Sequence, residues 1–351
     1  MVYGSVGISF LRQGDRVRVQ HRLYVVADDE LHLGVFDDVE PSSDSPGPSP
    51  LGGLIRLFEG ELPRDKSRRK LAKPDLETLA ELPPLPGCPF GALLALGSGS
   101  RSTRETGVLM ALDTAGRLSG RIAHIDLSVL YAPLRAQFPD LNIEGALVCS
   151  GELRLLQRGN QGGSRNACIR FDWNQVVPWL VAQDSPAPAA KAVQVITLGD
   201  IDGVGLSLTD GAALDHGAWA FCAVAENTGD SFHDGACAGS VVGVVVADGQ
   251  VTQVQRLWGA PKVEGLAVQV SGQALALTLV TDADDAAVAA RENVRYGYDL
   301  RLIPYASIRH PCRPANPTRT PCTTGGTDAA HRAVVARAAG GATLGHRLCV
   351  A

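Results

Sequence analysis

Residues 143–147 read IEGAL, residues 209–214 read TDGAAL, and residues 263–268 read VEGLAV. In each phrase an acidic residue and a glycine lie at the head of an apolar run, and the phrase returns roughly every 60 residues. Each copy leads to a second apolar run that ends in polar residues, over 153–160, 219–227 and 275–285. A period of this size is typical of a repeat architecture, so the repeat decides the fold class.

Short β-rich segments within each repeat predict about four strands, which is the content of one propeller blade. The third repeat has them at 143–148, 152–157, 167–171 and 193–198, and the fourth at 211–214, 218–225, 240–246 and 251–257. The fifth repeat opens at Val263 and Ala274 and has a third candidate strand at 296–303. We therefore expect an all-β, five-bladed β-propeller.

The first two repeats are weaker copies of the phrase. Residues 73–79 resemble 262–268 and open the second repeat, with Asp75 in the place of Glu264. Residues 5–9 open the first repeat, 16–21 form an insertion and 23–27 form its second strand. The N-terminal residues would then supply the last strand of the fifth blade. A six-bladed propeller is the alternative, if 91–127 is a separate unit.

Other segments lack the strand pattern. Residues 128–137 and 173–182 favour short helices, whereas 40–51 and the basic stretch 61–73 are typical of solvated, disordered loops. Residues 310–351 lack β alternation, so we expect a propeller domain over 1–309 and a disordered or non-native tail over 310–351.

Composition restricts the class of protein. The chain has 351 residues and a net charge of −5, so it has no basic footprint for nucleic acid. No apolar run reaches the roughly 18 residues of a membrane span, and no signal peptide is evident. The eight cysteines form no C-x-x-C pair, and Cys149, Cys168 and Cys222 fit small buried hydrophobes. We expect a cytoplasmic monomer with no membrane or nucleic-acid partner.

The acidic residue of each phrase is a candidate metal ligand. First strands line the centre of a propeller, so Asp75, Glu144, Asp210 and Glu264 are expected to face one another, with Ser5 or Ser9 in the fifth place. Such carboxylates repel one another unless a cation intervenes, and calcium accepts several carboxylates at loose geometry. The alternative is a structural ring, in which the acids accept backbone N–H bonds and Lys262 and Arg158 neutralise part of the charge.

The polar ends of the second strands form a second ring of candidates, on one face of the disc. The candidate ligand-binding residues there are Arg101, Arg158, Asn160, Glu226 and Asp282. The nearby loop 230–235 holds His233, a candidate acid or base, and Asp234, which would tune it. The alternative for this pair is an ordinary polar loop, because no nucleophile elbow accompanies it.

Several segments together resemble an uncharacterised bacterial β-propeller family, a domain of unknown function. They are LYVVADDE at 23–30, ALGSGSR at 95–101, NIEGA at 142–146, LQRGN at 156–160, TDGAA at 209–213, HDGACAGS at 233–240 and VTDADD at 280–285. More distantly, the blade pattern is similar to the esterase-like domain of phytases and to five-bladed apyrase-type nucleotidases. That likeness matches Glu144 and Glu264, whereas Asp75 and Asp210 depart from it, and it implies a calcium propeller.

Two functional hypotheses follow. The first is a calcium-dependent hydrolase of phosphate or carboxylic esters at the channel mouth, in which Arg101 and Arg158 bind a small anionic substrate and His233 transfers a proton. The second is a non-catalytic propeller that binds a ligand or protein and whose acidic ring is structural. Fold alone does not decide between them.

Overall fold

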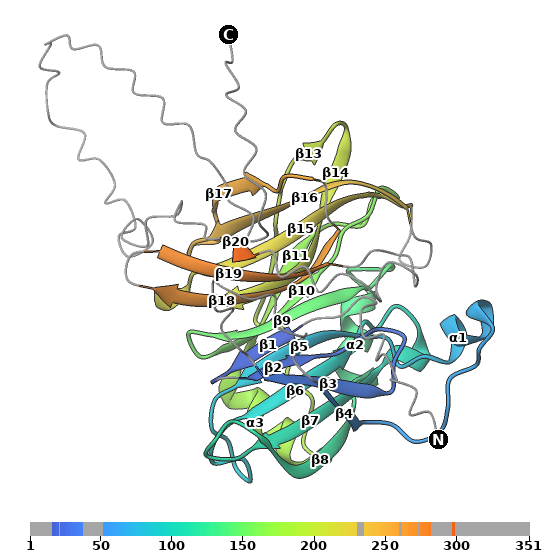
Figure 1. Ribbon diagram of the computed structural model, residues 1–351, viewed down its shortest axis with the longest axis vertical. Coiled ribbons are helices and arrows are strands. Elements are labelled where there is room, and N and C mark those ends of the chain that lie inside the picture. Colours follow the sequence, from blue (N-terminus) through green and yellow to red (C-terminus); the bar gives the residue numbers. More distant parts are fainter. Residues whose placement is uncertain are drawn as a thin grey trace, which may run out of the picture.

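The computed structural model describes residues 16–20, 22–37, 52–229, 235–259, 262–271, 274–281 and 297–298. Strands dominate them and form five antiparallel sheets, four of which contain at least four strands (Figure 1). The first sheet comprises β1 (Arg16–Val19), β2 (Arg22–Val25), β3 (His32–Asp37) and β4 (Gly53–Arg56), and the second β5 (Leu76–Leu82), β6 (Ala92–Gly97), β7 (Thr106–Leu112) and β8 (Leu118–Asp126).

The remaining sheets follow the same up-and-down order. The third comprises β9 (Ile143–Cys149), β10 (Glu152–Gln157), β11 (Ala167–Asp172) and β12 (Ala192–Val195). The fourth comprises β13 (Asp200–Ile201), β14 (Val204–Ala213), β15 (Trp219–Asn227), β16 (Ala236–Val245) and β17 (Val251–Arg256), and the fifth β18 (Val263–Ser271), β19 (Ala274–Thr281) and β20 (Gly297–Tyr298).

The innermost strands hold the sheets around a common centre. β5 contacts β1 and β9, β14 contacts β9 and β18, and β18 contacts β1. In Figure 1, β1, β5 and β9 lie side by side in the middle of the molecule, whereas β8 and β17 lie at its periphery. The arrangement is propeller-like, which confirms the all-β, propeller class. Residues 91–127, the candidate sixth unit, form β6, β7 and β8 of the second sheet.

Apolar side chains fill the space between neighbouring sheets. The middle strands β6 and β10 are buried along their whole length because both of their faces are covered. Leu153 and Leu155 of β10 pack toward the second sheet, and Leu156 packs toward the fourth. The outer strands β8 and β17 are largely exposed and polar, which protects the sheet edges.

Two helices lie where the sequence predicts them. α2 (Ser128–Arg135) buries Leu130, Tyr131 and Leu134, and α3 (Trp173–Val181) buries Val176, Trp179 and Leu180. Both join the apolar cluster between the second and third sheets. The described residues also form two 3₁₀ turns, η1 (Ser102–Arg104) and η2 (Asp215–Gly217). No described helix is long and apolar enough to cross a membrane.

Two predictions about the N-terminal third are wrong. Residues 16–19 are not an insertion but the first strand, β1, which pairs with β2. The stretch 61–73 is not a disordered loop: it contains α1 (Lys66–Ala72), capped by Asp65, whose carboxylate accepts from the Arg68 N–H. Ion pairs to Asp28, Asp29 and Glu30, in the turn between β2 and β3, hold this basic segment in place. Residues 5–9, 40–51 and 310–351 lie outside the described part of the chain.

Leu155→Ala tests the inter-sheet core. Leu155 is fully buried, so we expect the substitution to lower the free energy of unfolding by about 2–5 kcal/mol. The matched control is Leu71→Ala, because Leu71 lies on α1 and is 53% exposed. Urea denaturation measures both. Equal losses in the two variants would contradict this account of the core.

Candidate functional site

Irregularities in strand pairing place one inner-strand residue of each of four sheets outside the ladder. The register skips Glu77 in β5, Glu144 in β9, Thr209 in β14 and Glu264 in β18. A β-bulge of this kind leaves its extra residue unpaired and redirects its side chain. These four residues are therefore the structurally equivalent positions near the centre.

This register corrects the predicted equivalence of the acidic residues. Glu144 and Glu264 occupy the bulge position as expected. In the second sheet the position belongs to Glu77 and not to Asp75, and in the fourth to Thr209 and not to Asp210. Matching the acidic residues of the repeats gives the wrong position in these two sheets, because backbone pairing and not residue type sets the place of the bulge.

The glycines of the repeated phrase allow the inner strands to approach one another. A Cβ added to Gly145 would lie 3.1 Å from the Asp210 Cα, and one added to Gly211 would lie 2.7 Å from the Leu156 Cδ1. Both contacts cross from the third sheet to the fourth. The glycine therefore serves close packing between sheets rather than only a turn.

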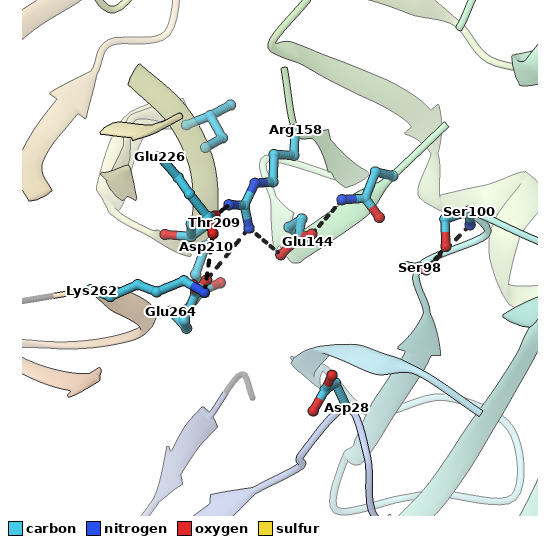
Figure 2. A network of polar contacts seen from close by, with 12 residues as sticks. Asp28, Ser98, Ser100, Glu144, Arg158, Thr209, Asp210, Glu226, Lys262 and Glu264 are labelled. Carbon is cyan, nitrogen blue, oxygen red and sulfur yellow. Dashed lines mark hydrogen bonds and ion pairs between the residues drawn. The ribbon is translucent and has the colours of Figure 1, made fainter. Parts of the chain in front are cut away.

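Arg158 connects three sheets at the centre (Figure 2). It follows β10, and its guanidinium lies 3.3 Å from the Glu144 carboxylate and 3.7 Å from that of Glu264, and it also donates to Glu226. Burial alone would lower the pKa of Arg158, but these three carboxylates raise it overall. The residue expected to bind an anionic substrate thus holds acidic side chains of its own protein.

Lys262 reinforces the same contacts. Its Nζ lies 3.5 Å from an oxygen of Glu226 and 3.5 Å from an oxygen of Glu264. Two of these carboxylates also accept hydrogen bonds from residues near them in sequence: Glu226 accepts from the Gly235 N–H, and Glu144 accepts from the Asn142 side-chain amide. The predicted partial neutralisation by Arg158 and Lys262 is therefore present in the structure.

A second charged group surrounds Asp75. The Asp75 carboxylate lies 2.7 Å from the Lys73 Nζ and 2.7 Å from an Arg104 nitrogen, and it accepts from the Ser98 hydroxyl. Lys73 also contacts Asp28, which follows β2. Asp75 has a left-handed backbone, with φ of 58°, a conformation that aspartate adopts more readily than most residues. Lys73 thereby joins the first sheet to the second.

Glu77 interacts electrostatically with both charged groups. Burial raises the pKa of its carboxyl most, Glu144, Asp75 and Asp28 raise it further, and Lys73 lowers it. Glu77 is half-buried, and it forms no hydrogen bond or ion pair with any residue that the structure describes. Sequence reasoning missed it because the lone Glu after Leu76 lacks the glycine of the repeated phrase.

The remaining predicted metal ligand, Asp210, is bound to backbone. One of its oxygens accepts from the Gly211 N–H and the other accepts from the Leu266 N–H of β18, at 2.6 Å. The neighbouring Thr209 hydroxyl donates to the Val263 carbonyl at 2.8 Å. Together these bonds join the fourth sheet to the fifth, as the structural alternative for the acidic ring predicts.

We call the six carboxylates and four basic side chains of this region the central network. Its members are Asp28, Asp75, Glu77, Glu144, Glu226, Glu264, Lys73, Arg104, Arg158 and Lys262. Among described residues, the one group of three potential metal ligands is Asp28, Asp75 and Glu77, whose oxygens lie within 4.8 Å of one another. The structure does not gather Glu144, Asp210 and Glu264 into such a group with Asp75.

Burial raises the pKa of four carboxyls in the central network, those of Asp28, Glu77, Glu144 and Glu264. The pKa of Glu264 rises to about 7, because burial and the neighbouring Glu144 and Glu226 outweigh Arg158 and Lys262. The pKa values of Glu77 and Glu144 are raised for the same reason, first by burial and then by neighbouring carboxylates. Protons therefore bind more readily here than to exposed carboxyls.

Other predicted residues lie apart from the central network. Asn160, in the loop after β10, donates to the side chain of Asp140. Arg101 is exposed at the start of η1. His233, Asp234, Asp282 and the two serines of the fifth place lie outside the described residues. Lys73 and Arg104 were missed: Lys73 was read as part of a solvated basic loop, and no motif marks Arg104.

With this geometry in view, comparison with known proteins places the chain in a family. The model of a family of unknown function, DUF6910, matches residues 69–286, which is more than half of the chain. The chain belongs to this family, which confirms the predicted resemblance to a domain of unknown function. No curated protein matches the sequence.

Solved structures show remote likeness only. Hydrazine synthase of Kuenenia stuttgartiensis is 10% identical, with a TM-score of 0.34 over 79% of this chain and 58% of that one. The Pan2 WD40 domain of Neurospora crassa is 10% identical, with a TM-score of 0.32 over 79% of this chain and 63% of that one. The WD40 propeller domain of Doa1 is 9% identical, with a TM-score of 0.30 over 77% and 90%. The chain spans less than two thirds of the first two, and at these scores the likeness carries no functional argument.

Arg158→Leu tests the central network as a link between sheets. The substitution leaves three buried carboxylates without their shared cation, so we expect the free energy of unfolding to fall by about 3–5 kcal/mol. Arg256→Leu is the control, because Arg256 forms an exposed pair with Asp202 and should cost less than about 1 kcal/mol. Urea denaturation that gives similar losses for both variants would rule out this role.

The raised pKa values predict how stability depends on pH. A carboxyl with a raised pKa in the folded state contributes stability that is present below its unfolded pKa and lost as the pH rises through its folded pKa. With the pKa of Glu264 at about 7 and those of Glu77 and Glu144 also raised, stability should fall as the pH rises from about 5 to about 8.

Glu77→Gln should make this dependence shallower and raise the urea midpoint at the upper end of the range, because it removes a carboxylate that has no ion pair. The control is Glu61→Gln, the same change at an exposed residue. Urea midpoints across the pH range measure the slope. A Glu77→Gln slope equal to that of the control would contradict the prediction.

Proposed function

We propose that this protein is a non-catalytic, five-bladed β-propeller that binds a divalent cation within its central network, with calcium as the preferred ion. Five sheets and the contacts of β18 with β1 support the blade number. The cation would complete the neutralisation of buried charge. A small ligand or a protein would then bind the face that carries the site.

The charge imbalance of the central network carries this proposal. Six carboxylates face four basic side chains within the central network, and the carboxylate of Asp210 lies buried beside it, so negative charge is in excess. Buried carboxylates without a counter-charge take up protons or bind a cation. The raised pKa values describe the first of these responses, in the absence of any ion.

Asp28, Asp75 and Glu77 are the residues that would hold the cation. All three supply oxygen, which hard cations prefer, and Glu77 brings a carboxylate that has no described partner. Calcium suits this set better than magnesium, because it accepts irregular oxygen geometry, whereas magnesium demands a near-ideal octahedron. Lys73, which already contacts Asp28 and Asp75, would share these carboxylates with the ion.

Binding has better support than hydrolysis. Arg158, the proposed anchor of an anionic ester, is surrounded by three carboxylates, which would repel such a substrate. The proposed proton-transfer pair, His233 and Asp234, lies outside the described residues. Calcium-dependent hydrolysis of phosphate or carboxylic esters therefore stays a prediction, which a screen of both ester classes would test.

Calcium titration with thermal melting tests the proposal. We expect calcium to raise the melting temperature of protein first treated with a chelator, and isothermal titration to give one ion per chain. Glu77→Gln should weaken calcium binding at least tenfold, because it removes one charged ligand. Glu61→Gln should bind like the wild type. A melting temperature that neither chelator nor calcium alters, together with no heat of binding, would exclude the site.

A further inference from the structure

A second charged cluster lies at the opposite end of the third sheet from Arg158. Glu152 and Arg154 lie at the start of β10, Arg170 lies near the end of β11, and Lys191 immediately precedes β12. Arg158 follows the other end of β10, roughly 13 Å beyond Arg154 at the rise of an extended strand. This second cluster therefore shares no side chain with the central network.

The cluster has more cations than anions. The Glu152 carboxylate contacts all three basic side chains: Lys191 at 2.9 Å, Arg154 at 3.4 Å and Arg170 at 3.7 Å. Asp172 pairs with Glu152 in the ladder, but one of its oxygens caps α3 by accepting from the Asn174 N–H. Even with Asp172 included, three cations face two carboxylates.

The two arginines lie directly opposite each other in the ladder. Arg154 of β10 pairs with Arg170 of β11, an arrangement that is unfavourable for like charges. One carboxylate at 3.4 and 3.7 Å compensates for it only in part. Burial alone would raise the pKa of Glu152, but Lys191, Arg170 and Arg154 lower it overall, which shows that the field of the cluster is positive.

Both arginines also retain unused donors. The Nε of Arg154 and the Nε of Arg170 are buried and have no hydrogen-bond partner among the described residues. Arg154 is only 5% exposed; its Nη1 donates to the Gly217 carbonyl and its Nη2 donates to Glu152. A buried N–H without an acceptor costs free energy, so these two N–H groups call for an acceptor that the described residues do not supply.

We propose that Arg154, Arg170 and Lys191 form a binding site for a small oxyanion, a phosphate or carboxylate group. The Nε and Nη donors of an arginine match two oxygens of such a group, and two facing arginines can hold it from both sides. Lys191 adds a point charge from a side chain that is 57% exposed, at the solvent-facing side of the cluster. The ligand would relieve the repulsion between the arginines.

Isothermal titration with inorganic phosphate, and separately with acetate, tests this site at constant ionic strength. We expect at least one of the two anions to bind the wild type, and the one that binds more tightly defines the ligand class. Arg170→Gln should weaken that binding about tenfold or more, because a charge-assisted pair of hydrogen bonds is lost. Arg170→Lys should restore only part of it, because lysine keeps the charge but not the fork.

Two further variants keep the test decisive. Lys191→Met changes a mostly exposed side chain, so it should fold like the wild type and still weaken binding. Arg256→Gln is the matched control, because Arg256 is an exposed arginine on β17 and should leave binding unchanged. Failure of both anions to bind the wild type, or equal weakening in Arg256→Gln, would overturn the proposal. Neither result depends on calcium at the central network.

Discussion

The ion pairs of the buried Arg158 guanidinium are the interaction on which the packing of the sheets at the centre of the molecule depends. The guanidinium neutralises carboxylates from the third, fourth and fifth sheets at once, so these sheets share one counter-charge. Lys73 has the corresponding role between the first and second sheets. Apolar packing holds neighbouring sheets together along their lengths, whereas these ion pairs hold them at one end, where acidic side chains would otherwise repel.

The two ends of β10 differ in their balance of charge. In the central network carboxylates outnumber basic side chains, and burial raises the pKa values of Glu77 and Glu264, which favours a proton or a metal ion. At the other end of β10 the balance is reversed, and arginines with unused donors favour an oxyanion. A single strand thus connects two regions of opposite electrostatic character.

Much of the fold could be predicted from sequence because the repeat is carried by local patterns. The apolar runs of β9, β10, β14 and β18 and the helices α2 and α3 are visible as periodicity and turn residues. The first sheet was predicted less well, since β1 has the basic sequence RVRV and resembles an insertion. Segment 61–73 was also misread, because its basic residues are ordered by carboxylates distant in sequence.

The sequence by itself determined the repeat, the propeller class and the presence of acidic residues on the inner strands. It placed Glu144 and Glu264 correctly, because in those repeats the acidic residue and the bulge coincide. Only the tertiary structure decided that Glu77 and Thr209 occupy the equivalent positions, and that Lys73 and Arg104 enter the network. The reason is physical: a bulge is defined by pairing with a neighbouring strand, and an ion pair by proximity in space, and neither leaves a periodic trace in the chain.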